Sequence, residues 1–256
     1  MYPDNEAAIP CPHCGGTGFR TVDGPGHIGY AAPCSCADQR LRESMLLRAQ
    51  IPVKFGRASL DNFVVQAEGN PILHSHRSNV IMKVKQWSRS YLGQISDSMP
   101  KGLLFTGPPG TGKTHLAVAA LRAVLDKGFE GVFHDYQTLI GTVARSWGRD
   151  AEPSHAEAFR RAADIELLVI DDLGAMRAME WAEDIITDLI TTRYNRMKPV
   201  IVTTNLPDPD IARNAGHNRL AKTLAEVIGQ RSRSRLIEMC RVVDTSGLTD
   251  YRLLNR

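Results

Sequence analysis

The sequence predicts an α/β fold in which a five-stranded parallel sheet lies between helices and a small cysteine-rich module precedes it. From about residue 78, short apolar runs alternate with segments of helical periodicity, which is typical of a parallel sheet with both faces covered. Residues 1–36 are instead rich in Gly, Pro and Cys and have little periodicity. We therefore expect three parts: a module at 1–50, a lead-in segment at 51–77 and the main domain at 78–256.

The individual elements follow from local patterns. The expected strands are short apolar runs, and the expected helices carry apolar residues at three- and four-residue spacing. Strands are expected near 102–106, 131–134, 166–170, 199–203 and 240–244. Helices are expected near 79–92, 113–127, 136–147, 155–163, 179–196 and 218–238.

Composition and charge exclude several classes of protein. The chain has 256 residues, of which 43% are hydrophobic, enough for one α/β core and a small appendage. No apolar run approaches the roughly 18 residues that span a bilayer, and the N-terminus lacks the order of a secretory signal. We therefore expect a cytoplasmic protein with no membrane partner, whose cysteines are thiols or metal ligands rather than disulfides. The net charge of +3 is too small to indicate nucleic-acid binding by itself.

The segment GPPGTGKT at 107–114 is a complete phosphate-binding loop of the G-x-x-x-x-G-K-T type. An apolar strand precedes it and a helical pattern follows it, which is the context that this motif requires. The glycines allow successive N–H groups to turn toward one anion, and the start of the helix adds its positive dipole. Lys113 then reaches the β- and γ-phosphates, and the Thr114 hydroxyl is suited to hold Mg²⁺. The sequence thus predicts a nucleoside triphosphate site.

A second motif, LLVIDDLG at 167–174, places two carboxylates directly after a buried strand. In open α/β sheets, ligands bind at this end of the strands. We expect Asp171 to hold Mg²⁺ through water and Asp172 to orient and deprotonate the attacking water. On its own, an apolar run ending in two aspartates also describes a strand that enters a turn. The spacing from the phosphate loop favours the catalytic interpretation.

Two further polar positions follow downstream. Asn205 ends the strand pattern of VIVTTN, where it is placed to position the water or touch the γ-phosphate; the alternative is a turn-forming Asn before Leu206-Pro207. The run GQRSRSRL at 229–236 has two interpretations. It is either a solvated helix end, or the source of an arginine that stabilises charge on the transferred phosphoryl group, often in a neighbouring subunit.

Four cysteines form a C-x₂-C…C-x-C set in the N-terminal module. Tetrahedral zinc requires four soft ligands, and a segment this poor in apolar residues cannot build a core of its own. We expect Zn²⁺ to order the module, with His13 and His27 as substitutes if one cysteine does not bind; four unrelated thiols are the alternative. Because four protein ligands leave no open position, the expected role is structural and partner-binding. Cys240, on an apolar strand, is expected in the core. The expected zinc ligands are Cys11, Cys14, Cys34 and Cys36.

With these motifs in this order, the chain resembles AAA+ ATPases of the DnaC/IstB group, which are bacterial and phage helicase loaders and transposition helpers. The likeness covers roughly 51–256 and includes IPVKF leading to Phe63, GPPGTGKTHLA, LLVIDDLG, TTNL and RSRSRL. It implies an AAA+ P-loop fold without a C-terminal helical lid, since few residues follow the arginine-rich segment. The nucleotide-binding residues that it implies are Gly107, Pro108, Pro109, Gly110, Thr111, Gly112, Lys113, Thr114 and His115.

The resemblance also implies catalytic roles. Asn205 matches sensor 1, Arg235 matches an arginine finger that acts on a neighbouring subunit, and Arg231 matches a second basic residue of the same segment. Arg233 points elsewhere on a helix and is a weaker candidate. Many AAA+ proteins have Glu where Asp172 stands. Because the Asp side chain is one methylene shorter, slow hydrolysis and a switch-like use of ATP are expected. The catalytic candidates are Lys113, Asp172, Asn205, Arg235 and Arg231.

Related initiators and loaders insert a helical element that touches single-stranded DNA between the second and third strands. In this chain that segment is 136–163. Arginines beside Trp147 suit phosphate contact and base stacking, whereas the neighbouring Asp150 and Glu152 weaken the signal. The candidate DNA contacts are Arg145, Arg149, Arg160 and Arg161.

The resemblance favours an ATP-driven loader that places a replicative DnaB-type helicase on single-stranded DNA. The N-terminal module would grip the helicase, and the ATPase domain would form a homo-oligomer or a ring or spiral templated by the helicase. The setting would be the bacterial cytoplasm, or the host cytoplasm for a phage protein. Two alternatives stay open: an IstB-type transposition helper that assembles on duplex DNA, and an ATP-binding scaffold with negligible hydrolysis. The implied cofactors are ATP, Mg²⁺ and Zn²⁺.

Overall fold

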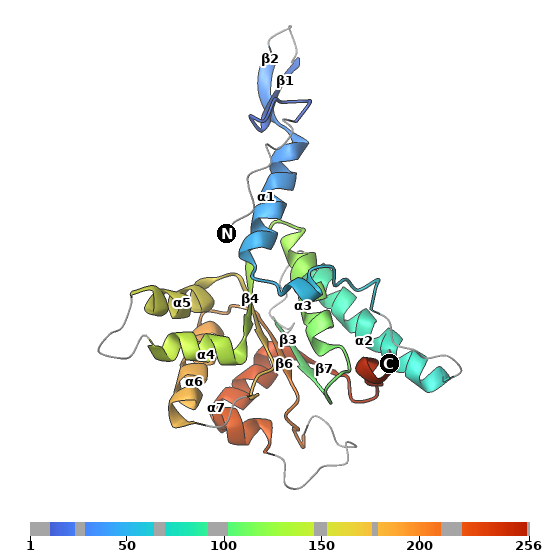
Figure 1. Cartoon of the computed structure of the whole chain (residues 1–256), viewed down its shortest axis with the longest axis vertical. Coiled ribbons are helices and arrows are strands. Elements are labelled where there is room, and N and C mark those ends of the chain that lie inside the picture. Colours follow the sequence, from blue (N-terminus) through green and yellow to red (C-terminus); the bar gives the residue numbers. More distant parts are fainter. Residues whose placement is uncertain are drawn as a thin grey trace.

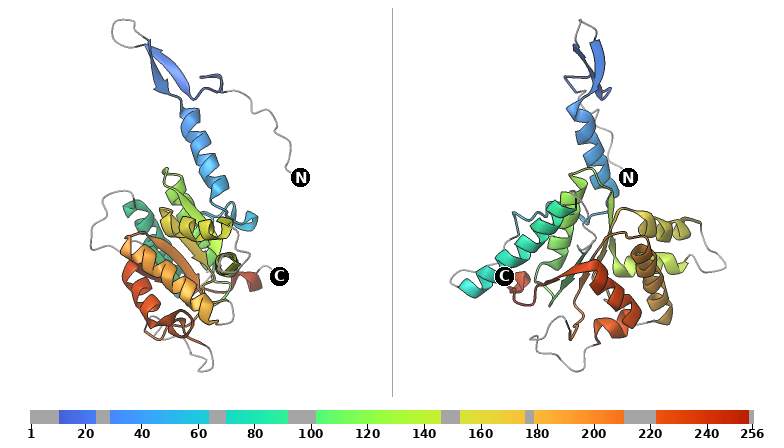
Figure 2. Two further views of the ribbon diagram at one scale, coloured as in Figure 1. Left: turned by 90° about the vertical axis from the view of Figure 1, so that its left-hand side faces the viewer. Right: turned by 180° about the vertical axis from the view of Figure 1, so that it is seen from behind.

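A computed structural model shows an α/β body from which one long helix projects, with a β-hairpin beyond its far end (Figures 1 and 2). The structure describes residues 11–23, 29–63, 70–91, 102–145, 153–175, 179–210 and 222–254.

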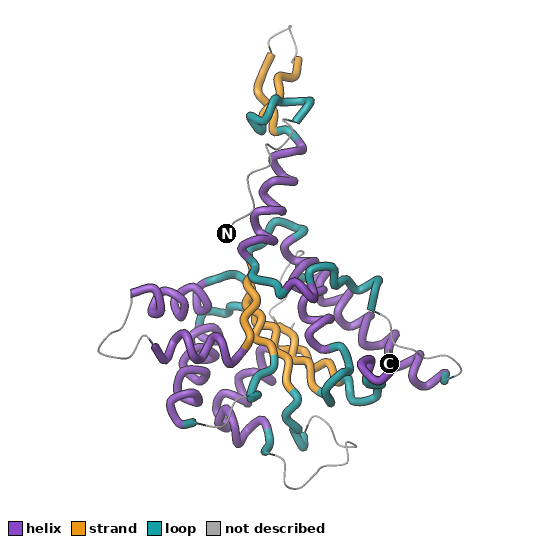
Figure 3. Tube along the Cα trace, in the orientation of Figure 1, coloured by secondary structure: helices purple, strands orange, loops and turns teal. Residues whose placement is uncertain are grey.

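The body is built on a parallel sheet, as the sequence predicts. Its five strands are ordered β4-β5-β6-β3-β7, and every neighbouring pair is parallel. Figure 3 shows these strands at the centre of the body with helices on both sides. The strands are β3 (Gly102–Thr106), β4 (Gly131–Asp135), β5 (Leu167–Asp171), β6 (Val200–Thr204) and β7 (Cys240–Asp244).

Alternate side chains of each strand enter two separate cores, because successive residues of a strand point to opposite faces. On β3, Leu103 and Phe105 pack against one set of helices, and Leu104 packs against the other. The first set comprises the end of α1 (Ser35–Arg48), α2 (Pro71–Ser90) and α3 (Lys113–Leu125). The second set comprises α4 (Tyr136–Ala144), α5 (Pro153–Asp164), α6 (Glu180–Asn195) and α7 (Leu224–Met239).

The first helix of the main domain was predicted too late in the chain. Helix α2 begins at Pro71 rather than near 79, because the side chain of Asn70 caps it by accepting hydrogen bonds from the N–H groups of Ile72 and Leu73. The expected domain boundary at 77/78 therefore falls inside a helix.

The arginine-rich helix also differs from its prediction. Helix α7 begins at Leu224 behind a capping box formed by Thr223 and Glu226, whereas the sequence pattern predicts a start near 218. Gly229 interrupts the helical dihedral angles at φ 76° and ψ 150°. The residues that follow this kink, including Arg235, thus take a different direction from the first turn.

The N-terminal module contains a β-hairpin that periodicity did not predict. Strand β1 (Phe19–Asp23) pairs antiparallel with β2 (Gly29–Pro33), and helix α1 follows directly. The end of α1 belongs to the main core: Met45 and Ala49 are buried there, and the N–H of Phe133 on β4 donates to the carbonyl oxygen of Ala49 at 2.8 Å. The expected boundary at residue 50 therefore separates residues that pack together.

The lead-in segment is also part of the core rather than a free connection. It forms the short 3₁₀ helix η1 (Val53–Phe55), and the side chains of Ala58 and Phe63 are buried against α2 and α3. Its path brings Phe55 and Phe63 to the phosphate loop, as described below.

One buried arginine fixes the outer helices to the sheet. Arg193 on α6 is 1% exposed and donates to backbone carbonyls of Ala162, Ile165 and Pro199 at 2.6, 3.1 and 2.6 Å. It joins the end of α5 to the starts of β5 and β6. Burial lowers the pKa of Arg193 to about 10, so the guanidinium stays charged at neutral pH. Of the helices in the described ranges, none is long and apolar enough to cross a bilayer.

Candidate nucleotide site and cysteine cluster

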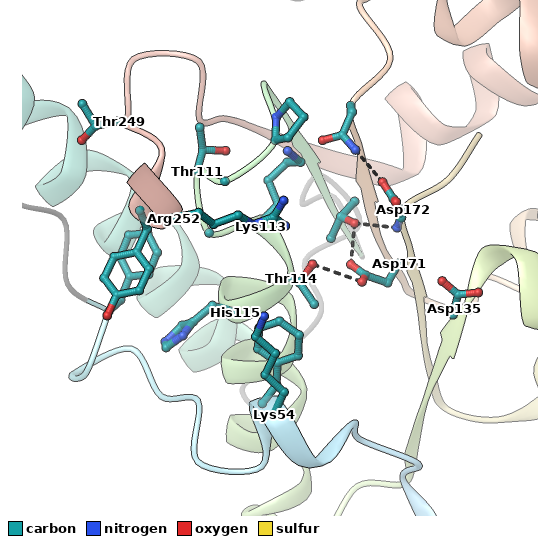
Figure 4. Close-up of a pocket in the computed structure, with 18 of the residues that line it drawn as sticks. Lys54, Thr111, Lys113, Thr114, His115, Asp135, Asp171, Asp172, Thr249 and Arg252 are labelled. Atoms are coloured by element: carbon teal, nitrogen blue, oxygen red, sulfur yellow. Dashed lines mark hydrogen bonds between the residues drawn. The ribbon is translucent and has the colours of Figure 1, made fainter. Parts of the chain in front are cut away.

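A cavity of about 660 Å³ opens at the carboxyl ends of the central strands, where open α/β sheets bind ligands (Figure 4). The phosphate loop and α3 form one wall, and the ends of β5 and β6 form the opposite one. Two segments that the sequence did not assign to the site complete it: the lead-in segment and the C-terminal residues after β7. The lining residues include Lys54, Phe55, Asn62, Phe63, Thr249, Tyr251 and Arg252 besides the predicted motifs.

The phosphate loop requires glycine at its inner positions. Gly112 has φ 84°, and a Cβ there would lie 2.5 Å from the ring of Phe63. Gly110 has φ 82°, and a Cβ there would lie 1.8 Å from a carboxylate oxygen of Asp250. Helix α3 begins directly at Lys113, so its positive N-terminal end adjoins the loop. The shape of the loop thus suits an anion, and Phe63 and Asp250 pack against it.

Lys113 is buried and bonded to its own loop. Its ammonium donates to the carbonyl oxygens of Gly107 and Pro108 at 2.7 and 2.6 Å. Burial lowers the pKa of Lys113 to about 8, although the nearby carboxylates of Asp172 and Asp171 act to raise it; the positive charge of Arg252 also lowers it. Phosphate oxygens entering the loop would replace these carbonyl acceptors and stabilise the positive charge of the lysine.

Three oxygen-bearing side chains meet at the end of β5. The hydroxyl of Thr114 donates to Asp171 Oδ2 at 3.1 Å, and the hydroxyl of Thr203 donates to Asp171 Oδ1 at 2.6 Å. Burial raises the pKa of Asp171, and these two hydrogen bonds oppose that rise. A hydroxyl and a carboxylate beside a phosphate loop fit Mg²⁺, which prefers oxygen ligands. Thr203 was not among the predicted site residues, and its only sequence signal is its place two residues before Asn205.

The two residues expected to position the attacking water contact each other. Asn205 donates from Nδ2 to Asp172 Oδ1 at 2.6 Å, and both side chains line the cavity (Figure 4). Asp172 adopts a left-handed conformation at φ 56°, and its N–H donates to the Thr203 hydroxyl at 2.8 Å. Thr203 therefore orients both aspartates at once.

The remaining cavity positions join distant parts of the chain. His115 Nε2 lies 2.9 Å from the carbonyl oxygen of Ser59, and its ring centroid is 5.5 Å from that of Phe63. Asp135 caps α4 by accepting from the N–H of Thr138 at 2.9 Å and also lines the cavity. No motif in the sequence identified Asp135, because its role depends on β4 lying beside β5.

The predicted arginines of α7 do not line this cavity. Arg235 donates to the Thr191 hydroxyl, and its guanidinium lies over the ring of Tyr194 at 5.6 Å on the side of α6. Arg231 is exposed. Arg233 forms an ion pair with the buried Asp208 at 2.6 Å. An action of Arg235 on phosphate would thus need the site of another subunit.

The arginines expected to contact DNA are dispersed. Arg145 ends α4, is exposed and donates to the Thr142 hydroxyl at 3.3 Å. Arg160 and Arg161 lie on α5, where Arg161 donates to the carbonyl oxygen of Arg48 at the end of α1 at 3.3 Å. Arg149 and Trp147 lie outside the described residues.

The four predicted zinc ligands come together below the β-hairpin. Their sulfur atoms all lie within 4.8 Å of one another, and Gly18 donates its N–H to Cys14 Sγ at 3.4 Å. This donor set fits tetrahedral Zn²⁺ without a histidine. His13 is exposed, and His27 lies outside the described residues. Cys240 is buried on β7, as expected. The cluster residues are Cys11, Cys14, Cys34 and Cys36.

Comparisons with known proteins agree with this arrangement. The family described as "IstB-like ATP binding protein" matches residues 97–256. The replicative helicase loader DnaC of Escherichia coli is 25% identical over 147 residues, which are 57% of this chain and 55% of that protein. A putative ATP-binding protein of an insertion sequence from Geobacillus stearothermophilus is 29% identical over 105 residues, 41% of this chain and 40% of that protein. The chain thus spans about half the length, or less, of these curated relatives.

Solved structures share this fold. The crystal structure of the DnaC helicase loader superposes with a TM-score of 0.59 and 28% identity, covering 75% of this chain and 99% of that one. The crystal structure of DnaI shares the fold at 18% identity and a TM-score of 0.57, covering 78% of this chain and 95% of that one. The family match spans the phosphate loop, both carboxylates and the arginine-rich helix. The chain therefore belongs to the IstB-like ATP binding protein family and has the AAA+ fold of the DnaC/IstB group.

Proposed function

We propose that this protein is an ATP-dependent loader that places a replicative DnaB-type helicase on single-stranded DNA. The observation that carries the proposal is the position of the cysteine cluster, beyond the far end of α1 and away from the nucleotide cavity (Figure 2). A cluster in that position is free to hold a partner while the body binds nucleotide. The similarity to DnaC supports the same assignment.

The side chains of the cavity suit slow ATP hydrolysis. In this proposal Lys113 and the loop bind the phosphates, and Asp172, held by Asn205, orients and deprotonates the attacking water. Mg²⁺ would be held by Thr114 and Asp171 and, when bound, would neutralise charge on the phosphates. Since Arg235 lies on the side of α6, away from the cavity of its own chain, it would complete the site of a neighbour.

A shared site requires assembly. The chain would act as a homo-oligomer or as a ring or spiral templated by the helicase. We propose that arginines of the segment 136–163, from the set Arg145, Arg149, Arg160 and Arg161, contact single-stranded DNA in that assembly. The setting would be the bacterial cytoplasm, or the host cytoplasm if a phage encodes the protein.

A second candidate function is a transposition helper that assembles on duplex DNA, and the insertion-sequence relative supports it. A third is a scaffold that binds ATP without turnover. The Asp172→Asn variant separates the third from the others: an unchanged rate of phosphate release would favour the scaffold.

Capture of a purified DnaB-type helicase tests the proposal. The full chain should retain the helicase, whereas the Cys34→Ser variant, which removes one of the four sulfur ligands, should lose it and still bind ATP. His13→Ala is the matched control, because His13 is exposed and the four cysteines suffice for zinc. Helicase captured equally by all three proteins would contradict the role of the module. If no protein captures helicase and ATP drives coating of duplex DNA, the transposition helper is the better assignment.

A further inference from the structure

The segment after β7 is packed against the phosphate loop. The N–H of Thr245 donates to the carbonyl oxygen of Thr106 at 2.8 Å, and its hydroxyl lies 2.7 Å from that of Thr111. At the other end of the segment, the N–H of Tyr251 donates to the carbonyl oxygen of Gly110 at 3.1 Å. Residues 245–251 are therefore held at both ends by the loop that binds phosphate.

The position of Arg252 is set by the same segment. Its N–H donates to Asp250 Oδ1 at 2.9 Å, and the carboxylate of Asp250 fills the space beside Gly110 that a larger residue would need. The Arg252 side chain lines the cavity and extends toward Lys113 (Figure 4). Its backbone is thus fixed next to the phosphate loop, while its guanidinium faces the ligand space.

Lys113 and Arg252 bring two positive charges to the same cavity. No ion pair links Arg252 to an acidic group in the described part of the chain. The carboxylates of Asp171 and Asp172 line the same cavity, and the two cations beside the phosphate loop favour a negative ligand there.

We propose that Arg252 is a nucleotide-binding residue of its own chain, whose guanidinium binds oxygen atoms of the terminal phosphates beside Lys113. This inference rests on the ATP-binding part of the proposed function and does not depend on the helicase. It separates two arginine roles: Arg252 acts within the chain, and Arg235 acts between chains.

Equilibrium binding by the full chain tests the inference. A fluorescent, non-hydrolysable ATP analogue, ADP and AMP would each be titrated in the presence of Mg²⁺ into wild type, Arg252→Ala, Arg252→Gln and Arg252→Lys. A charge-assisted hydrogen bond to phosphate is worth roughly ten- to hundredfold in affinity. We expect a loss of that order for the triphosphate in the Ala and Gln variants, a smaller loss for ADP and little change for AMP. Lysine should recover part of the loss, since it keeps the charge without the planar fork.

Arg241→Ala is the matched control, because Arg241 lies on β7 and donates to Gln86 Oε1 at 3.0 Å away from the cavity. Wild-type triphosphate affinity in Arg252→Ala and Arg252→Gln would overturn the inference, as would an equal loss for AMP or a loss that the control shares. Failure of wild type to bind the analogue would also overturn it. If the nucleotide affinities change as expected but the protein does not capture helicase, only the loader assignment is contradicted.

Discussion

The N–H of Phe133 on β4 donates to the carbonyl oxygen of Ala49 at 2.8 Å, and this bond fixes the end of α1 to an edge strand of the ATPase sheet. Arg161 adds a second bond, to the carbonyl oxygen of Arg48. The same strand ends at Asp135, which lines the nucleotide cavity. The helix that carries the cysteine cluster is therefore attached to the sheet at its base.

The base of α1 and the lead-in segment should be needed for stability. Phe63→Ala removes a side chain that is 4% exposed in the core, and the expected loss in the free energy of unfolding is about 3–5 kcal/mol. A truncation that starts at residue 71 should also lower the free energy of unfolding, whereas one that starts at residue 35 should leave it as in the full chain. Urea denaturation followed by circular dichroism checks both.

Phe19→Ala is the matched control, since Phe19 on the hairpin is 60% exposed and its loss should cost less than about 0.5 kcal/mol. Equal stability of the Phe63 and Phe19 variants would show that the lead-in segment is dispensable.

Nucleotide affinity should fall as pH rises through 8. Without nucleotide the pKa of Lys113 is about 8, so above that pH the side chain must take up a proton to bind phosphate as a cation. We expect up to about tenfold weaker ATP binding per pH unit between 8 and 9.5, measured by calorimetry with proton uptake. The nucleotide-free protein should show the opposite trend in stability, because the unfolded lysine holds its proton up to its ordinary pKa of 10.5. Lys113→Met should abolish the slope in stability, and the same slope in that variant would refute the assignment.

A mixture of two inactive variants should regain activity at the sites of one of them. Arg235→Ala should reduce phosphate release by roughly a thousandfold without weakening ATP binding, because Arg235 contacts Thr191 and Tyr194 rather than its own cavity. Lys113→Ala keeps an intact Arg235 and should lose nucleotide. In a mixed oligomer the second variant would supply its arginine to the site of the first. Steady-state phosphate release should therefore rise on mixing, and a mixture as inactive as its components would count against action between chains.

Zinc should bind at one ion per chain and be released with the loss of any one cluster cysteine. Cys36→Ser removes a sulfur that lies 3.2 Å from Cys14 Sγ, whereas Cys240→Ala removes a cysteine that is buried on β7. A chromophoric chelator should detect zinc in wild type and in the Cys240 variant but not in the Cys36 variant. ATP binding should survive in the Cys36 variant, since the cavity does not include the cluster. Full zinc content in that variant would rule out the four-cysteine site.

The features that depend on residues close together in the sequence were predicted well. Each of the five strands lies within a residue or two of its expected place, and the phosphate loop joins β3 to α3 as its glycines and Lys113 require. The start of α2 and the hairpin β1-β2 were missed, because a cap at Asn70 and a short strand pairing leave little periodicity in the sequence.

The sequence by itself determined the nucleotide motif, the two carboxylates after β5 and the set of four cysteines, because each is specified by residues close together in the chain. Only the tertiary structure decided that Ala49 bonds to Phe133, that Thr203 holds Asp171, and that Arg252 approaches Lys113. These contacts join segments separated by tens of residues or more. They depend on the strand order β4-β5-β6-β3-β7 and on how the chain packs before and after the sheet, and neither follows from local pattern.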